Sequence, residues 1–248
     1  MMATLIVAAA LGAPRLQPVA EIGTVWIAIN DLQLGRQGTP LDLAEEAGQD
    51  RLFPSVRLRL DLAHGPQRRN RFSLSYQPLE LNTRSVTTRD WRIRNQTFAA
   101  GTPMDIGFGF SFFRATWQRD VLKAEDWTLG LGANLQFRTS SLVFFAADGS
   151  RGVSQQEFGP VPSVLVRLRR DTPGAFFEAE LSALPVPLES AFDGFYELNL
   201  RAGLKDERGF EPYLVLRGLG GGFEGGSDGA FADSGLLAFV LGAGAAIR

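Results

Sequence analysis

Apolar and polar residues alternate at every second position along most of the chain after Ala20. In Ser55–Ala63, valine and leucine fill one set of alternate positions, and arginine and aspartate fill most of the other. In Trp127–Arg138, leucine and phenylalanine alternate with glycine, asparagine and glutamine. Successive side chains of a β-strand point to opposite sides of the sheet, so this period of two predicts strands with one apolar and one polar face.

The alternation predicts an all-β chain of about ten strands, with eight and twelve as alternative strand numbers. Most segments are near the roughly nine to eleven residues that a tilted strand needs to cross the hydrocarbon core of a bilayer. The expected strands are Glu21–Asp31, Ser55–Ala63, Arg71–Thr83, Met104–Arg119, Trp127–Ser141, Val161–Arg170, Ala175–Leu184, Asp193–Leu204, Phe210–Leu219 and Gly235–Ile247.

Short and long connections alternate between these expected strands. The short ones are Ala63–Asn70, Val121–Asp126, Asp171–Gly174 and Lys205–Gly209. The long ones are Leu32–Pro54, Arg84–Pro103, Leu142–Pro160, Pro185–Phe192 and Gly220–Ser234. An up-and-down antiparallel transmembrane barrel with short periplasmic turns and long external loops predicts this alternation, whereas a soluble Greek-key sandwich gives no reason for it.

Alternation alone does not say which face points outward. The apolar faces carry more large aliphatic and phenylalanine side chains than a small lumen could hold, and the polar faces mix glycine and serine with long charged side chains. We therefore expect the apolar faces to contact lipid, including the alternate positions from Met104 to Phe112. A soluble lipocalin-like carrier of an apolar ligand, with the two faces reversed, is the alternative.

Aromatic residues near strand ends support the membrane interpretation, because aromatic side chains gather at the two membrane interfaces. Trp117 fits its strand only if a bulge follows Phe113, and Pro78 predicts a bulge where the alternation slips phase. The expected interfacial aromatic residues are Trp26, Phe72, Trp127 and Phe210.

Composition narrows the chemistry. The 248 residues include no cysteine, which excludes disulfides, thiolate catalysis and thiolate zinc sites. The formal net charge is −2 and the basic residues are scattered, so no nucleic-acid partner is expected. We also expect no cofactor and no metal site.

The N-terminal segment through Ala13 is an apolar run followed by small residues, which is typical of a signal peptide and too short to cross a bilayer as a helix. We expect residues 1–20 to be the signal peptide and a lead-in, and residues 21–248 to form a single barrel domain.

This pattern, from Glu21 to Ile247, resembles the small outer-membrane β-barrel proteins of Gram-negative bacteria as an architectural class. The resemblance implies a location in the bacterial outer membrane. It also implies contact with outer-membrane lipids and lipopolysaccharide, recognition by the outer-membrane assembly machinery, and external loops open to protein partners.

The polar faces predict a lumen rich in charges of both signs, which is tolerable only if the charges pair or stay hydrated. For about ten strands, we favour a network that plugs the lumen over an open pore lining. The expected lumen charges are Arg57, Arg59, Asp61, Arg138, Arg167, Arg169, Glu178, Glu180, Glu197, Arg201, Glu211 and Arg217. Asp105 falls on the same set of faces.

The expected function is that of a non-enzymatic outer-membrane barrel, acting as a narrow channel or as a structural and surface-interaction scaffold. A barrel-embedded lipid-modifying or proteolytic enzyme is the alternative. It is disfavoured because the only histidine, His64, lies in an expected periplasmic turn, away from the external rim. No catalytic residue is assigned.

Overall fold

The computed structural model describes residues 14–184, 194–225 and 231–247, which form strands and one short 3-10 helix, η1 (Pro66–Arg68). The strands are β1 (Arg15–Leu34), β2 (Leu41–Asp42), β3 (Leu52–His64), β4 (Asn70–Gln77), β5 (Glu80–Val86), β6 (Trp91–Ile93), β7 (Gln96–Phe98), β8 (Pro103–Lys123), β9 (Trp127–Ala146), β10 (Gly152–Asp171), β11 (Ala175–Ala183), β12 (Gly194–Leu204), β13 (Phe210–Gly225) and β14 (Ala232–Ile247).

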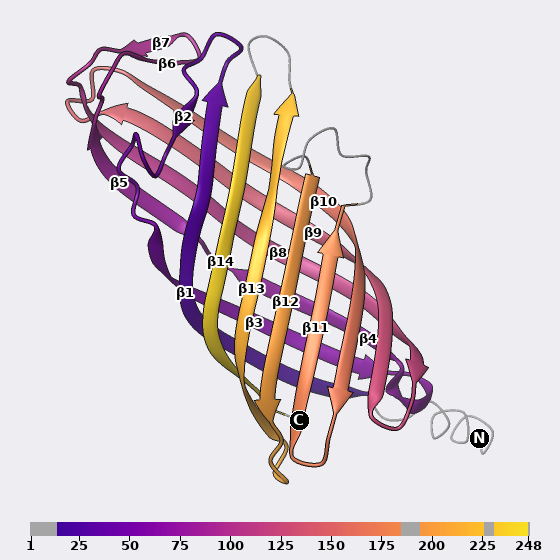
Figure 1. Ribbon diagram of the computed structural model, residues 1–248. Helices are drawn as coiled ribbons and strands as arrows, with labels where there is room; N and C mark the ends of the chain where they lie inside the picture. Colours follow the sequence, from indigo (N-terminus) through magenta and orange to yellow (C-terminus); the bar gives the residue numbers. More distant parts are fainter. Residues whose placement is uncertain (1–13, 185–193, 226–230, 248) are drawn as a thin grey trace, which may run out of the picture.

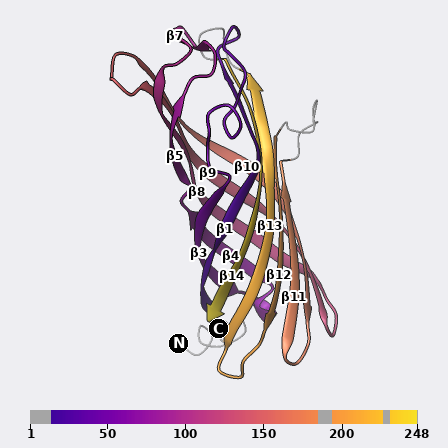
Figure 2. The same cartoon turned by 60° about the vertical axis from the view of Figure 1, so that its left-hand side comes forward.

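Antiparallel pairing of β1 with β14 closes the sheet into a barrel (Figure 1). Each wall strand pairs with its neighbours in the chain, and β4 and β5 act as one wall strand because both pair with β8. The barrel therefore has ten wall strands in up-and-down order, as the sequence predicts. The short turns and both ends of the described barrel lie at one end, here the turn end, and the opposite end is the loop end (Figure 2).

Strands extend further than their apolar segments. β9 and β10 have 20 residues each and are joined by only five, so the long loop expected over Leu142–Pro160 is wrong. Strand pairing continues there through polar residues such as Gln155, which pairs with Leu142. The first strand begins at Arg15, before the expected Glu21. The expected signal peptide falls mostly on residues 1–13, which lie outside the described part.

The loop end is filled by an apolar core. The connection between β1 and β3 and the hairpin of β6 and β7 fold against the inner wall, where Leu43, Trp91 and Phe98 are fully buried. Ala146 and Met104 from the barrel wall belong to the same core. This burial gives the long connections a fixed place over the loop end, because apolar surface removed from water stabilises the packed arrangement.

Below this core, the inward-facing residues of β1 change from apolar to charged. The inward residues of β1 pass from Leu32, through Ile27 and Val25, to Glu21 near the turn end. Val25 and Ile27 belong to a second apolar cluster, here the middle layer, which consists of Val25, Ile27, Leu79, Leu81, Leu219, Ala238 and Val240. The lumen therefore has a charged layer at the turn end, an apolar middle layer and an apolar core at the loop end.

The strand β8 corrects the expected orientation of Met104–Phe112. Met104, Ile106 and Phe112 are buried inside the barrel, and Phe113 and Trp117 are exposed on its outer face. The register through Phe112 and Phe113 is continuous, so the bulge expected after Phe113 is absent. One uninterrupted strand has apolar residues inside at the loop end and apolar residues outside at the turn end. The reversal occurs where two phenylalanines are adjacent.

The backbone at Pro78 also differs from the bulge that the sequence predicts. The wall strand is interrupted there, since β4 ends at Gln77 and β5 begins at Glu80. Proline has no N–H to donate to a ladder. The N–H of Leu79 instead donates to Oγ of Ser111 at 3.3 Å. A break in the strand, not a bulge within it, accounts for the slip in phase.

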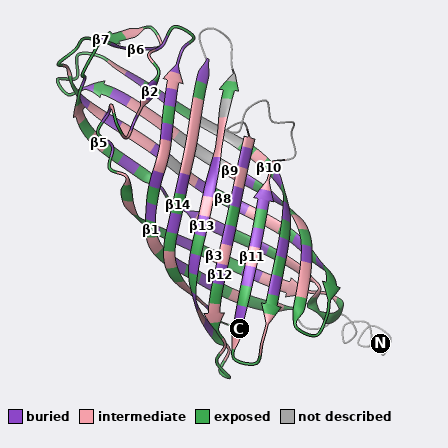
Figure 3. Ribbon diagram, in the orientation of Figure 1, coloured by how far each residue is buried: buried purple, intermediate pink, exposed green. Residues whose placement is uncertain are grey.

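The outer surface toward the turn end is largely apolar, while the side chains that alternate with it are buried (Figure 3). Leucine, valine and phenylalanine side chains are exposed on every wall strand, which is the reverse of a soluble carrier with an apolar cavity. Among the described residues, no helix is long and apolar enough to cross a membrane.

The position of Leu214 tests this outer band. Leu214 is 67% exposed and lies midway between Phe210 at the turn end and Gly218, which pairs with Phe239. We expect Leu214→Arg to lower the free energy of unfolding by about 2–4 kcal/mol, since it places a charge at the bilayer midplane. Leu204→Arg, at the turn-end terminus of β12, should cost only about 0–1 kcal/mol. Urea unfolding in lipid vesicles measures both, and equal losses would contradict the position of the band.

Candidate functional site

Most of the charges expected in the lumen are buried inside the barrel near the turn end. Arg59 is nearly buried, with 13% of its side chain exposed, and the side chain of Arg138 lies outside the described part. The buried members of the expected set are Arg57, Asp61, Arg167, Arg169, Glu178, Glu180, Glu197, Arg201, Glu211 and Arg217. The alternation of each strand thus places these charges on one face, and that face lies inside the closed barrel.

Glu197 on β12 is the centre of one group of ion pairs. Its Oε2 accepts a hydrogen bond from Nη2 of Arg114 at 2.5 Å. Its Oε1 lies 3.7 Å from Nη1 of Arg57 and 3.6 Å from Nε of Arg217. One carboxylate is therefore shared by arginines from β8, β3 and β13.

Glu21 on β1 is the centre of a second group. It forms ion pairs with Arg217 and, at 3.2 Å from Nε, with Arg201. The hydroxyl of Tyr213 donates to Oε1 of Glu21 at 2.9 Å. Arg217 touches both Glu21 and Glu197, so the two groups form one network.

Glu178 on β11 extends the network toward the turn end. Its carboxylate contacts Arg167 at 2.6 Å, Arg201 at 2.8 Å and Arg169 at 3.4 Å. Arg167 also lies 3.6 Å from Asp120 on β8. Each of these carboxylates has a cationic partner, as buried charge requires.

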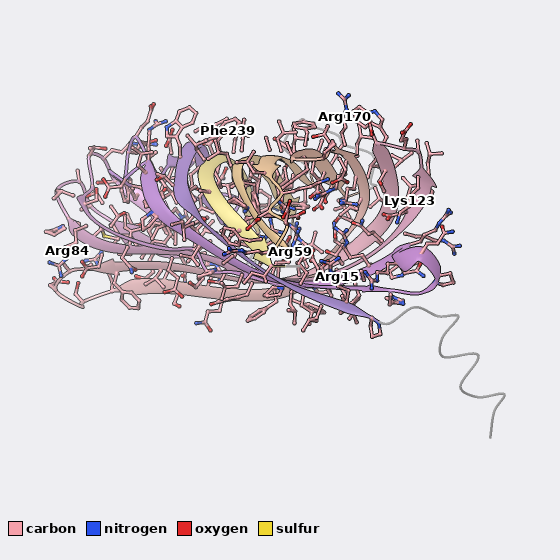
Figure 4. All side chains as sticks on the ribbon, turned by 90° about the horizontal axis from the view of Figure 1, so that it is seen from below. Arg15, Arg59, Arg84, Lys123, Arg170 and Phe239 are labelled. Atoms are coloured by element: carbon pink, nitrogen blue, oxygen red, sulfur yellow. The ribbon has the colours of Figure 1, made fainter. Side chains whose placement is uncertain are left out.

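Several contacts cross the lumen. In the closed ring of ten wall strands, β8 and β12 are four strands apart, yet Arg114 reaches Glu197. Arg217 on β13 donates to Oε1 of Gln77 on β4, also four strands away, at 2.7 Å. The charged side chains therefore meet across the interior of the barrel. Viewed from the turn end, they gather within the ring of strands (Figure 4).

Five members of the network are not among the expected lumen residues, namely Glu21, Gln77, Arg114, Asp120 and Tyr213. Glu21 begins an expected strand, and Gln77 precedes the break at Pro78. Arg114 and Asp120 belong to the inner face of β8, whose orientation was expected to be reversed. From Arg114 to Asp120 every second residue is polar, and these residues alternate with the exposed Phe113 and Trp117. This alternation is the signal that could have identified Arg114 and Asp120.

Asp105 is a correction to the expected lumen charges. It lies on the outer surface of β8 and forms an ion pair with the exposed Arg84 at 3.0 Å. Its position follows from the orientation of β8, because Met104 and Ile106 on either side of it point inward. Figure 4 places Arg84 on the outside of the barrel.

The expected interfacial aromatic residues are all exposed on the outer surface, at two levels. Phe72, Trp127 and Phe210 lie near the turn end, at or close to the first residues of their strands. Trp26 lies higher and stacks on Phe239 with ring centroids 5.6 Å apart. Their position at the membrane interfaces stays a prediction.

His64 is the last residue of β3 and lies at the turn end. Within residues 14–184, 194–225 and 231–247, no group of three histidine or carboxylate side chains is arranged to hold a metal ion. Nothing in this part of the structure brings His64 to the loop end, where the enzyme alternative would need it.

No protein-family model and no curated protein matches this chain. Among solved structures it is similar to the outer membrane protease OmpT from Escherichia coli, with 11% identity, 94% of this chain and 96% of that chain covered, and a TM-score of 0.63. It also matches the translocator domain of the autotransporter NalP from Neisseria meningitidis, with 11% identity, coverage of 98% and 92%, and a TM-score of 0.45. A third match is the Pseudomonas putida toluene transporter TodX, with 7% identity, coverage of 95% and 89%, and a TM-score of 0.34.

The likeness to OmpT shows that the chain has the fold of an outer-membrane β-barrel. The other two likenesses have TM-scores too low to add to that conclusion. The fold supports the expected location in the bacterial outer membrane. At this level of identity it carries no activity across.

Neutralising Glu197 tests the network. Glu197→Gln leaves Arg57, Arg114 and Arg217 around a neutral group, and we expect it to lower the free energy of unfolding by about 3–5 kcal/mol. Glu207→Gln, in the exposed turn before β13, is the matched control and should change it by less than about 0.5 kcal/mol. Urea titration of both variants measures the difference. A loss no larger than the control's would show that Glu197 is not structurally coupled to the arginines.

Proposed function

We propose that this chain, which has the fold of an outer-membrane β-barrel, is a non-enzymatic scaffold with a plugged lumen that presents its loop end to partners outside the cell. The observation that carries the proposal is the contact of Arg114 with Glu197 across the lumen. Ion pairs between distant walls fill the space through which a solute would pass.

The apolar layers add a second obstacle. Above the charged layer, Ile27, Leu81 and Val240 pack together in the middle layer. Above these, the core around Trp91 and Phe98 occupies the loop end. A hydrated ion entering from the turn end would have to break ion pairs and then lose its water against apolar side chains, which is costly.

The loop end supports the scaffold proposal in another way. The connections after β1 and β5 are held by internal contacts, including an ion pair of Arg89 with Glu46 at 2.8 Å. Oε1 of Gln49 accepts a hydrogen bond from Nδ2 of the buried Asn30 at 2.7 Å. A preformed surface loses less conformational entropy on binding than a disordered one. External protein partners and lipopolysaccharide remain proposed partners, as does the machinery that assembles the barrel.

A narrow channel is the second candidate. It is favoured by the charge of the turn-end layer, where the buried Nε and Nη1 of Arg57 have no hydrogen-bond partner within the described residues. Water around such groups could form part of a path. The enzyme alternative has no comparable observation, and the expectation of no enzymatic activity stays a prediction.

Planar-bilayer recording separates the two candidates. We expect the purified barrel, inserted after its fold is verified by a heat-dependent gel shift, to show no stepwise conductance. Arg217→Gln should also stay closed, because the middle layer remains in place. The outward-facing Arg84→Gln is the matched control. Steady conductance in the unmodified protein, with an ion selectivity that shifts in Arg217→Gln but not in Arg84→Gln, would overturn the scaffold proposal and assign a channel.

A further inference from the structure

We propose that the turn-end mouth of the barrel is a binding site for an oxyanion, that is, a phosphate group presented either as a free ion or as a lipid headgroup. A cavity of about 240 Å³ lies there, and part of the ion-pair network lines it. It is lined by residues from both sides of the barrel, including Gln17 on β1, Arg71 on β4 and Tyr213 on β13.

Positive charge exceeds negative charge around this cavity. Its lining includes seven cationic side chains and four carboxylates. The cations are Arg15, Arg59, Arg68, Arg71, Lys123, Arg169 and Arg201, and the carboxylates are Asp61, Asp120, Glu178 and Glu211. An oxyanion would reduce this excess.

The carboxylates are already occupied. Asp61 lies 3.1 Å from Nε of Arg59, and Asp120 lies 3.3 Å from Nζ of Lys123. Glu178 is shared by arginines of the network, and Glu211 lies 3.5 Å from Arg169. All four of the lining carboxylates therefore have cationic partners.

The surplus cations are Arg15, Arg68 and Arg71. None of the three has a carboxylate within 4.0 Å among the residues that the structure describes. Arg15, Arg59 and Lys123, which are labelled in Figure 4, line the same cavity. Cations that line one cavity repel one another, and a bound anion reduces that repulsion.

A buried donor faces the same space. The side chain of Arg201 is 3% exposed and lines the cavity. Its Nε is paired with Glu21, but its buried Nη2 has no hydrogen-bond partner among the described residues. Guanidinium groups form strong, directional hydrogen bonds with phosphate oxygens. The cavity is several times the roughly 30 Å³ of liquid volume that one water takes, so a phosphate group with some water fits.

A free phosphate ion and a phospholipid headgroup both present phosphate oxygens. The position of the cavity makes it accessible to either source. In an outer-membrane barrel the turn end faces the periplasm, where a free phosphate ion can enter the mouth. The headgroup of a phospholipid beside the rim is the other source. Both would place phosphate oxygens among Arg15, Arg71 and Arg201.

Titration of the full-length barrel with inorganic phosphate tests the proposal. In a non-ionic detergent at low ionic strength, we expect saturable binding by calorimetry. Arg71→Gln should weaken it at least about tenfold, since a charge-assisted contact is lost. Arg170→Gln is the matched control, because Arg170 lies near the same end on the outer face of β10 and is exposed. Its affinity should be unchanged.

A second variant keeps the test valid if Arg71→Gln does not fold, which the gel shift reports. Arg15→Gln changes the first residue of β1 and should weaken phosphate binding in the same way. No saturable binding, or an equal loss in Arg170→Gln, would overturn the proposal.

Nanodiscs identify the source of the phosphate group. The headgroup phosphate of phosphatidylcholine is neutralised by its own choline cation, so in discs of this lipid alone a free ion should bind as in detergent. In discs that contain phosphatidylglycerol, a lipid headgroup in the site would abolish phosphate binding to the unmodified protein. The weak residual binding of Arg71→Gln should then be the same in both kinds of disc. Equal binding in both kinds of disc supports the free ion. The bilayer recordings test the plugged lumen separately. A phosphate site at the turn-end mouth can exist whether the lumen above it is plugged or open.

Discussion

The structure depends on one constraint, which is that backbone N–H and C=O groups in hydrocarbon have no water to pair with. The pairing of β1 with β14 satisfies it by closing the sheet, so the membrane-facing wall has no free edge. Closure in turn fixes an inside and an outside for every strand. Once those sides exist, the period of two along the sequence separates lipid-facing side chains from lumen-facing ones.

The lumen then has its own requirement, because charge placed inside must be compensated. Glu197, Glu21 and Glu178 each contact at least two arginines, and Arg217 joins two of these groups. Shared carboxylates make the layer a network and not a set of separate pairs. Double-mutant measurements within it should therefore be non-additive, as for other residues in direct contact. Such a network specifies one arrangement of the inner wall.

The two ends of the barrel differ in chemistry. At the loop end, long connections bury Trp91 and Leu43 and close the barrel with apolar contacts. At the turn end, short connections leave a charged mouth in which cations outnumber carboxylates. The first arrangement favours a preformed external surface, and the second favours an anion on the periplasmic side. The middle layer around Ile27 separates them.

Much of this architecture is encoded locally. The strand number and the antiparallel order follow from the alternation and from the lengths of the connections. Alternation also places charges such as Arg167 and Glu178 on one side of their strands, because a strand has only two faces. Trp26 and Phe210 are exposed on the outer face, and their position at the membrane interfaces stays a prediction. The location of strand ends was less well determined. Pairing between β9 and β10 continues beyond the apolar band, and an extended hairpin in water needs no apolar face toward lipid.

The sequence by itself determined that strands with two unlike faces would form and that their charges would share one side. Only the tertiary structure decided which side that was along β8, where Met104 and Arg114 both point inward although one is apolar and the other charged. Alternation records a change of side at each residue, but it does not record what each side faces. The core formed by distant loops turns the inner face of β8 apolar at one end, and the arginines and carboxylates of other strands make it polar at the other. That environment comes from residues far apart in the chain, so it exists only once the barrel has closed.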